Sequence, residues 1–278
     1  MTIDEIIDAA LKEDIGNGDH TSMSIIPSSA HGKARLLIKE EGIVCGIDVA
    51  IKVLNKVDSS IAIKRILSDG DRVKPGDLAF TVEGPSVSIL TAERLVLNFM
   101  QRMSGIATTT NYYVQQLKGT STRLLDTRKT TPLLREIEKY AVKIGGGENH
   151  RFGLYDMILI KDNHIDFAGG ITGAVISVKD YLKSKNLNLE IEVEARTISD
   201  VKEILGCENI KRIMLDNFST TLMKEAVELI DGRVETEASG GITIKNLREY
   251  AETGVDFISV GALTHHIKSL DMSLKAFF

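Results

Sequence analysis

Residues 212–238 read RIMLDNFSTTLMKEAVELIDGRVETEA, and this stretch decides the fold class. Residues 212–216 and 234–238 are short runs typical of β-strands, and residues 220–230 between them carry apolar side chains at helical spacing. A strand, a helix and a strand in this order predict two parallel strands joined by a right-handed crossover. The stretch is therefore one repeat of an α/β domain.

The same alternation continues through the chain from residue 123 onward. Helical segments such as residues 244–252 separate the strands. Repeated units of this kind predict a closed or nearly closed barrel, and because six clear strands are two fewer than an eightfold barrel needs, two strands are expected to be missing or irregular. The six predicted strands are residues 123–126, 155–160, 189–194, 212–216, 234–238 and 256–260.

The first hundred residues have a different pattern. Residues 2–14 have helical spacing, with a capping box formed by Thr2 and Glu5. Within residues 32–83, short β-type runs at 34–39 and 42–46 and turn signals at 69–70 and 74–76, around DRV and LAFTVEG, predict a small β-rich domain. Further helices are expected at residues 49–57 and 90–103.

Composition excludes several classes of protein. Of 278 residues, 43% are hydrophobic and 26% are charged, as is usual for soluble proteins. The net charge of −5 argues against a nucleic-acid partner, and no apolar run is long enough to span a membrane. Cys45 and Cys207 lack metal-ligand spacing. Because no signal-peptide pattern is present, we expect a cytoplasmic protein without a membrane partner.

Residues 123–164 form a basic stretch in this acidic chain. They contain eight Lys or Arg against six Asp or Glu, which is +2 and leaves −7 for the remainder. The positive groups lie beside turn signals instead of along one helix face. This arrangement predicts a pocket for a ligand with several negative charges, such as phosphates or carboxylates.

Polar residues or glycines follow every predicted strand of the barrel. Because the carboxyl ends of barrel strands meet at one mouth, these residues are expected to form a single site. In chain order they are Asp126 to Lys129, Lys161 to His164, Glu194 to Arg196, Asp216 with Asn217, Ser239 to Gly241, and Gly261.

The strand LEIEVE at residues 189–194 alternates apolar side chains with glutamates. If the apolar face meets the helices, Glu192 and Glu194 point into the barrel, where a carboxylate needs a partner. The Lys and Arg residues after the first two strands are the expected partners. The alternative is an edge strand with one face exposed to solvent.

The glycine-containing ends after the last two strands predict a phosphate site, because backbone amides at such loops bind phosphate in many barrels. A hard cation held by Glu194 and Asp216 together with substrate phosphate oxygens is also expected. A transition-metal site that uses His150, His164, Asp162 and Asp216 is the weaker interpretation, since their spacing matches no metal motif.

Several motifs resemble those of the quinolinate phosphoribosyltransferase family, the decarboxylating nicotinate-nucleotide pyrophosphorylases of NAD biosynthesis. The resemblance covers essentially the whole chain in order. The motifs are EDIGNGDHTS (13–22), ERLVLNFMQRMSGIAT (93–108), TRKTTP (127–132), GGGENHR (145–151), KDNH (161–164), EVE (192–194), LDNF (215–218) and EASGGIT (237–243).

The resemblance implies an amino-terminal α/β sandwich followed by an incomplete α/β barrel. We therefore expect a first domain at residues 1–104 and a barrel domain at 105–267, with the tail at 268–278 packing back on the first. It also implies a homodimer with shared active sites, in which Arg94 of one subunit enters the site of the other. Assembly of dimers into hexamers stays open.

The implied reaction joins quinolinate to 5-phosphoribosyl-1-pyrophosphate and releases pyrophosphate and CO2, with Mg2+ accompanying the phosphoribosyl donor. Guanidinium groups suit a planar dicarboxylate because they bind carboxylates in a bidentate way. Glu194 and Asp216 are expected near the ribose, where positive charge develops. The acceptor is expected to contact Arg94 of the partner subunit, Arg128, Lys129, His150, Arg151 and Lys161, and the 5-phosphate to contact Ser239, Gly240, Gly241 and Gly261. The residues expected to be catalytic are Lys129, Lys161, Glu194 and Asp216.

Three alternatives remain open from the sequence. A related phosphoribosyltransferase of the molybdate-operon type would use another acceptor on the same scaffold. A Schiff-base lyase would use Lys161 as its nucleophile. A phosphate-sugar sensor would bind the donor without turnover.

Overall fold

The computed structural model describes residues 2–277. Its contacts divide the chain into two compact units. Unit 1 comprises residues 2–112, 130–146 and 263–277, and unit 2 comprises residues 113–129 and 147–262. Residues 130–146 thus group with unit 1, although the sequence placed them in the barrel domain.

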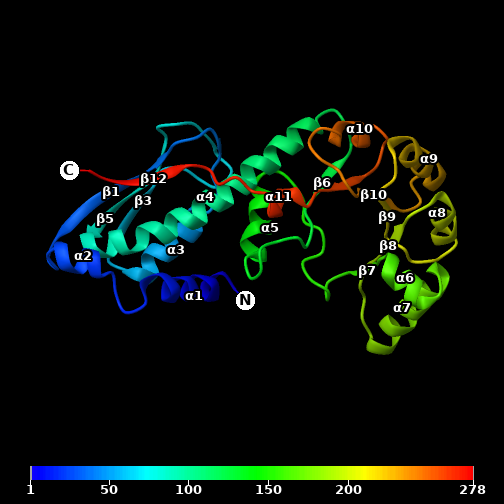
Figure 1. Cartoon of the computed structure of the whole chain (residues 1–278), viewed down its shortest axis with the longest axis horizontal. Helices are drawn as coiled ribbons and strands as arrows, with labels where there is room; N and C mark the ends of the chain where they lie inside the picture. The colour runs from blue at the N-terminus through cyan, green and yellow to red at the C-terminus, as the bar shows by residue number, and fades with distance from the viewer. Residues whose placement is uncertain (1, 278) are drawn as a thin grey trace. The chain divides into compact units, whose positions relative to one another are not determined.

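Unit 1 is built around an antiparallel sheet in the order β12-β1-β5-β3 (Figure 1). The strands are β1 (His31–Ile38), β3 (Ala62–Arg65), β5 (Leu78–Pro85) and β12 (Met272–Phe277), and a separate pair consists of β2 (Gly42–Ile43) and β4 (Arg72–Val73). Neither β3 nor β12 was among the strands predicted from the sequence. β12 pairs with β1 from Lys33↔Phe277 to Ile38↔Met272, so the last strand of the chain completes a sheet begun by the first.

The helices of this part of the chain are α1 (Ile3–Ile15), α2 (His20–Ile25), α3 (Ile47–Val57), the long α4 (Ser86–Gln116), α5 (Arg135–Ile144) and α11 (Ala262–His265). Thr2 caps α1 with the predicted capping box, and Asp19 caps α2 by accepting from the Ser22 amide. Side chains from the sheet, such as Leu36 and Phe80, are fully buried, as are Leu54 of α3 and Met100 of α4. Unit 1 therefore has an apolar α/β core.

Unit 2 contains one parallel sheet in the order β6-β11-β10-β9-β8-β7. Its strands are β6 (Arg123–Leu125), β7 (Ile158–Ile160), β8 (Ile191–Ala195), β9 (Arg212–Asp216), β10 (Glu235–Ser239) and β11 (Phe257–Ser259). All six predicted strands are confirmed. β6 and β7 stand at opposite ends of the order and do not pair, so the barrel is open, as expected.

Helices connect these parallel strands: α6 (Asp162–Ala168), α7 (Ile171–Lys185), α8 (Ile198–Leu205), α9 (Thr220–Ile230) and α10 (Leu247–Ala251). Thr197 and Ser219 cap α8 and α9, which fixes where each helix begins after its strand. β8 lies between β7 and β9, so the edge-strand interpretation of residues 189–194 is wrong. Its five residues are all buried.

No helix in residues 2–277 is both long enough and apolar enough to cross a membrane.

Candidate active site

A cavity of about 170 Å³ opens where the strands of unit 2 end. Its wall includes six of the residues predicted for the site: Arg128, Lys129, His150, Arg151, Lys161 and Ser239. It also includes Thr127, which the sequence placed at the end of the first strand, and four residues to which the sequence gave no role: Leu159, Met214, Glu237 and Ser259. The predicted anion pocket and the barrel mouth are therefore one place.

Two arginines form the cationic wall of this pocket. Burial and the neighbouring charge of Arg128 lower the pKa of Arg151 from its ordinary value. The Arg151 guanidinium also donates to the Met157 carbonyl oxygen at 3.2 Å, which fixes its direction. Two like charges held together favour a bound anion, because the anion relieves their repulsion.

Asp126 at the end of β6 places His150 in the pocket wall. Its carboxylate is fully buried and accepts from the His150 amide at 2.9 Å and from the Asn149 side chain at 2.5 Å. Glu148 forms an isolated parallel bridge with Leu125. The segment that follows the triple glycine at residues 145–147 therefore lies beside β6, but it does not form a regular strand.

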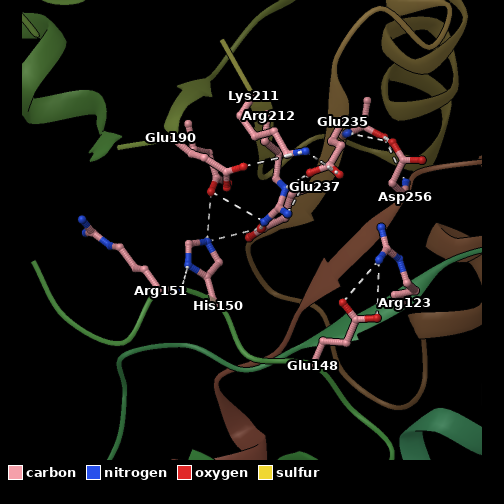
Figure 2. A network of polar contacts seen from close by, with 12 residues as sticks. Arg123, Glu148, His150, Arg151, Glu190, Lys211, Arg212, Glu235, Glu237 and Asp256 are labelled. Carbon is pink, nitrogen blue, oxygen red and sulfur yellow. Dashed lines mark hydrogen bonds and ion pairs between the residues drawn. The ribbon is translucent and has the colours of Figure 1, made fainter. Parts of the chain in front are cut away.

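His150 forms a buried ion cluster with Glu192, Glu237 and Arg212. Figure 2 shows three of these residues, His150, Glu237 and Arg212. His150 Nε2 lies 3.1 Å from Glu192 Oε2 and 3.4 Å from Glu237 Oε2. Arg212 Nη1 lies 3.8 Å and 3.3 Å from the same two oxygen atoms. Both glutamates are fully buried, so each needs these positive partners.

The cluster changes the protonation of its members. Burial lowers the pKa of His150, but Glu192 and Glu237 offset this and raise it to about 9. The Arg151 amide donates to His150 Nδ1 at 2.7 Å, which opposes a proton on that nitrogen. Two buried carboxylates at Nε2 outweigh one amide dipole, so the imidazole is protonated at neutral pH.

The two carboxylates are unequal. Burial and the charge of Glu237 raise the pKa of Glu192 to about 7. Burial also acts to raise the pKa of Glu237, but His150, the Ser259 hydroxyl and Arg212 together lower it below its ordinary value. The pair titrates as one unit, with Glu237 the more acidic member.

Among residues 2–277, only His150, Glu192 and Glu237 have ligand atoms close enough together to hold a metal ion. The residues do not fit that use, because Arg212 already contacts the oxygen atoms that a dication would need. The weaker interpretation, a transition-metal site of His150, His164, Asp162 and Asp216, finds no support in residues 2–277, since of these four only His150 appears in this group.

Glu194 pairs with Lys161, whose Nζ lies 3.6 Å from Glu194 Oε2, as the sequence predicted. Burial raises the pKa of Glu194, Lys161 opposes that change, and the charges of Asp216 and Asp162 add to it. A carboxyl group crowded by two other carboxylates suits a nearby cation. Glu192, in contrast, is paired with His150 and Arg212, so its predicted partners after the first two strands were wrong.

The glycines after β10 are required by the backbone. Gly240 and Gly241 have φ of 91° and 61°, and a Cβ atom on Gly240 would lie 2.2 Å from Asn217 Oδ1. Asn217 follows β9, and its amide donates to the Ser239 carbonyl oxygen. The ends of β9 and β10 are thus tied together, which places Asp216 opposite Ser239 in register.

Not every predicted residue lines the cavity. Glu194, Asp216, Gly240, Gly241 and Gly261 stand outside its wall, although each follows or ends a strand of the same sheet. Arg94 lies on α4 with its side chain exposed.

The sequence missed Arg212 and Glu237. The signal was present, because RIMLD and ETEAS place Arg212, Met214 and Asp216, and likewise Glu235, Glu237 and Ser239, on one strand face.

Two family models match the chain. The model described as quinolinate phosphoribosyl transferase, N-terminal domain, matches residues 19–104, and the corresponding C-terminal domain model matches residues 106–275. A nicotinate-nucleotide pyrophosphorylase [carboxylating] of Arabidopsis thaliana is 49% identical over 97% of this chain and 81% of its own length. A probable enzyme of that name from Bacillus subtilis is 40% identical over 99% of this chain and 93% of its own length.

Solved structures agree with these matches. The nicotinate-nucleotide pyrophosphorylase of Francisella tularensis is 42% identical, has a TM-score of 0.93, and matches over 99% of this chain and 96% of its own. A protein from Streptococcus pyogenes is 38% identical with a TM-score of 0.94, over 99% of this chain and 97% of its own. At these values the chain has the same fold as both structures and is related to them in sequence.

Proposed function

The chain belongs to the quinolinate phosphoribosyltransferase family, and from this premise we propose that it transfers a phosphoribosyl group to quinolinate with loss of CO2. The products are nicotinate mononucleotide, pyrophosphate and CO2, a step in the synthesis of NAD. The observation that carries the proposal is the pocket in which Arg128, Arg151, Lys129 and Lys161 converge. Four cationic side chains around about 170 Å³ suit a small, planar dianion.

In the proposed reaction the pyridine nitrogen forms a bond to C1 of the phosphoribosyl donor as the bond to pyrophosphate breaks. Positive charge develops on the ribose, and the carboxylates of Glu194 and Asp216 stabilise it. The ring nitrogen is then cationic and stabilises the electron pair that stays on C2 when the bond to the carboxylate breaks and CO2 leaves. That pair then binds a proton from water, which takes the place of the carboxylate on C2.

The remaining roles follow from position. Ser239, Gly240, Gly241 and Gly261 present a hydroxyl and backbone amides to the 5-phosphate, because they follow the last two strands of the barrel. Glu194 and Asp216 would hold Mg2+ together with oxygens of the donor, and the ion would supply positive charge beside the leaving pyrophosphate. His150 faces the acceptor as an imidazolium.

We further infer a cytoplasmic homodimer in which Arg94 of the partner subunit completes each acceptor site. Its support is an exposed arginine within the motif ERLVLNFMQRMSGIAT. Mixing R94A with K129A subunits tests it, since each hybrid dimer contains one site with neither substitution. Activity should return toward about a quarter of the wild-type value at random mixing. Hybrid dimers without activity would contradict a shared site.

The test of the main proposal is incubation of the purified protein with quinolinate, 5-phosphoribosyl-1-pyrophosphate and Mg2+. Nicotinate mononucleotide and CO2 should form in equal amounts, and EDTA should stop their formation. Equal use of nicotinate as acceptor, or no product at all, would overturn the proposal. Borohydride reduction in the presence of carbonyl compounds should give no adduct at Lys161, which separates the enzyme from a Schiff-base lyase.

A further inference from the structure

The acceptor pocket contains an acid that its proposed ligand does not explain. Glu237 lines the cavity, and its carboxylate is fully buried and has a lowered pKa, so it is charged at neutral pH. Glu192, also fully buried, shares the His150 contact with it. A dianionic acceptor placed above two carboxylates would be repelled unless their charge is compensated.

Compensation comes from two cations in different positions. His150 forms part of the pocket wall, as Glu237 does, and contacts both acids through Nε2. Arg212 contacts the acids from the start of β9, and its side chain is 13% exposed. The Arg212 guanidinium is held there by Glu235, which accepts from Nη2 at 3.0 Å, and by the Phe257 ring, 4.0 Å from its Cζ atom. Figure 2 shows Arg212 between Glu237 and the Glu190 and Lys211 pair.

Without Arg212, the charge of His150 would be the one positive partner that Glu192 and Glu237 share in this cluster. Its imidazolium would then compensate the acids instead of attracting a ligand carboxylate. With Arg212 present, the four groups together are neutral when His150 is protonated and both carboxylates are ionised, which their pKa values place between about pH 7 and about pH 9. Arg212 thus cancels the net negative charge that would otherwise lie beneath the pocket wall.

We propose that Arg212 is a positioning residue for acceptor binding: by neutralising Glu192 and Glu237 from below, it allows the pocket to accept a dicarboxylate. The inference rests on the proposed function, because it concerns the same acceptor. It adds to that function that the preference for a dianion depends in part on Arg212, which does not line the pocket. Coulomb repulsion by an uncompensated acid acts about twice as strongly on a dianion as on a monoanion.

The test compares two ligands on one variant. Binding of quinolinate and of nicotinate, which lacks the second carboxylate, is measured by calorimetry for wild type and R212Q at pH 8, above the pKa of Glu192 and below that of His150. We expect R212Q to weaken quinolinate binding by roughly tenfold or more and nicotinate binding by clearly less. Equal weakening of both ligands would overturn the proposal, since a general loss of structure affects both.

Lys211 supplies the matched control. It is the preceding residue, carries the same charge, and contacts Glu190 and Glu235 but neither acid of the cluster. K211Q therefore removes one positive charge from the same end of the same strand. It should leave the ratio of the two affinities unchanged, and a change equal to that of R212Q would show that total charge, not the cluster, is responsible.

Two further variants keep the test decisive if R212Q is too unstable to purify. R212K retains the charge and should bind quinolinate within a few-fold of wild type. R212Q/E237Q removes one charge of each sign, so the cluster keeps its net charge and should recover most of the preference for the dianion. A folded double variant that still binds quinolinate more than tenfold less tightly than wild type, with nicotinate binding intact, would overturn the proposal.

Failure of the inference is distinct from failure of the proposed function. If wild-type protein neither binds nor converts quinolinate, the function is wrong. If wild type converts it but the variants show no difference between the two ligands, only the role of Arg212 is wrong.

Discussion

The two main sheets bury different kinds of side chain. In the antiparallel sheet of unit 1, β1 buries Ala34, Leu36 and Ile38 and exposes Lys33 and Arg35 between them. In the parallel sheet of unit 2, β8 buries Glu192 and Glu194.

This difference indicates that one sheet mainly stabilises the fold, whereas the other carries charged groups of the active site. Burial of apolar side chains stabilises a fold by about 25 cal/mol per Å² of surface, whereas a buried ion cluster contributes little net stability and is costly to break. The sheet of unit 1 therefore serves mainly as scaffold, and the sheet of unit 2 carries charges because the site needs them. Four predictions test this contrast.

The largest effect is expected in the scaffold sheet. Phe80 of β5 is fully buried, and F80A should lower the free energy of unfolding by about 3–5 kcal/mol, because it removes a large apolar side chain and leaves a cavity. Urea unfolding measures the loss. Folded F80A should keep the quinolinate affinity of wild type, and an affinity loss as large as that of a pocket variant would weaken the contrast.

A loss of activity without a loss of stability is expected for a substitution of Arg151 in the pocket wall. R151A should lower kcat/KM for quinolinate on the order of a hundredfold, because a charge-assisted contact to the acceptor is lost. Its melting temperature should stay close to that of wild type, since the guanidinium is only partly buried. Steady-state kinetics beside thermal unfolding checks both parts, and a large drop in melting temperature would contradict the assignment.

The buried cluster should make stability depend on pH. Because folding raises the pKa of His150 from 6.5 to about 9, its contribution is fully present below about pH 6.5 and is lost as the pH rises through 9. The amount is on the order of 3 kcal/mol. Comparison of H150Q with wild type from pH 6 to 10 should show a stability difference that shrinks with rising pH. A difference independent of pH would mean that His150 is neutral in the fold.

The smallest effect is expected at the surface of unit 1. Lys33 pairs with Glu83 across β1 and β5 at 3.2 Å, with both side chains about half exposed. K33A should change the free energy of unfolding by less than about 1 kcal/mol, because solvent screens exposed pairs. A larger loss would show that charged pairs stabilise the scaffold as well, which would remove the contrast between the sheets.

Much of the fold and part of the site followed from local pattern. The six parallel strands and the capping box of Thr2 and Glu5 were predicted, since periodicity and turn residues act within a few positions of one another. The open form of the barrel was implied by the family resemblance. The cationic residues Arg128, Lys129, Arg151 and Lys161 were predicted to converge, because parallel strands end at one edge. β3 and β12 were missed because their strand character depends on pairing with β5 and β1.

By itself, the sequence determined which face of each strand carries charge, because side chains alternate along a strand whatever lies beside it. It also identified the pair Lys161 and Glu194. Tertiary structure alone decided that Glu192 meets His150 and Arg212, and that Glu237 joins them. Those partners come from three other chain segments, and only the lateral order and register of the strands bring them together.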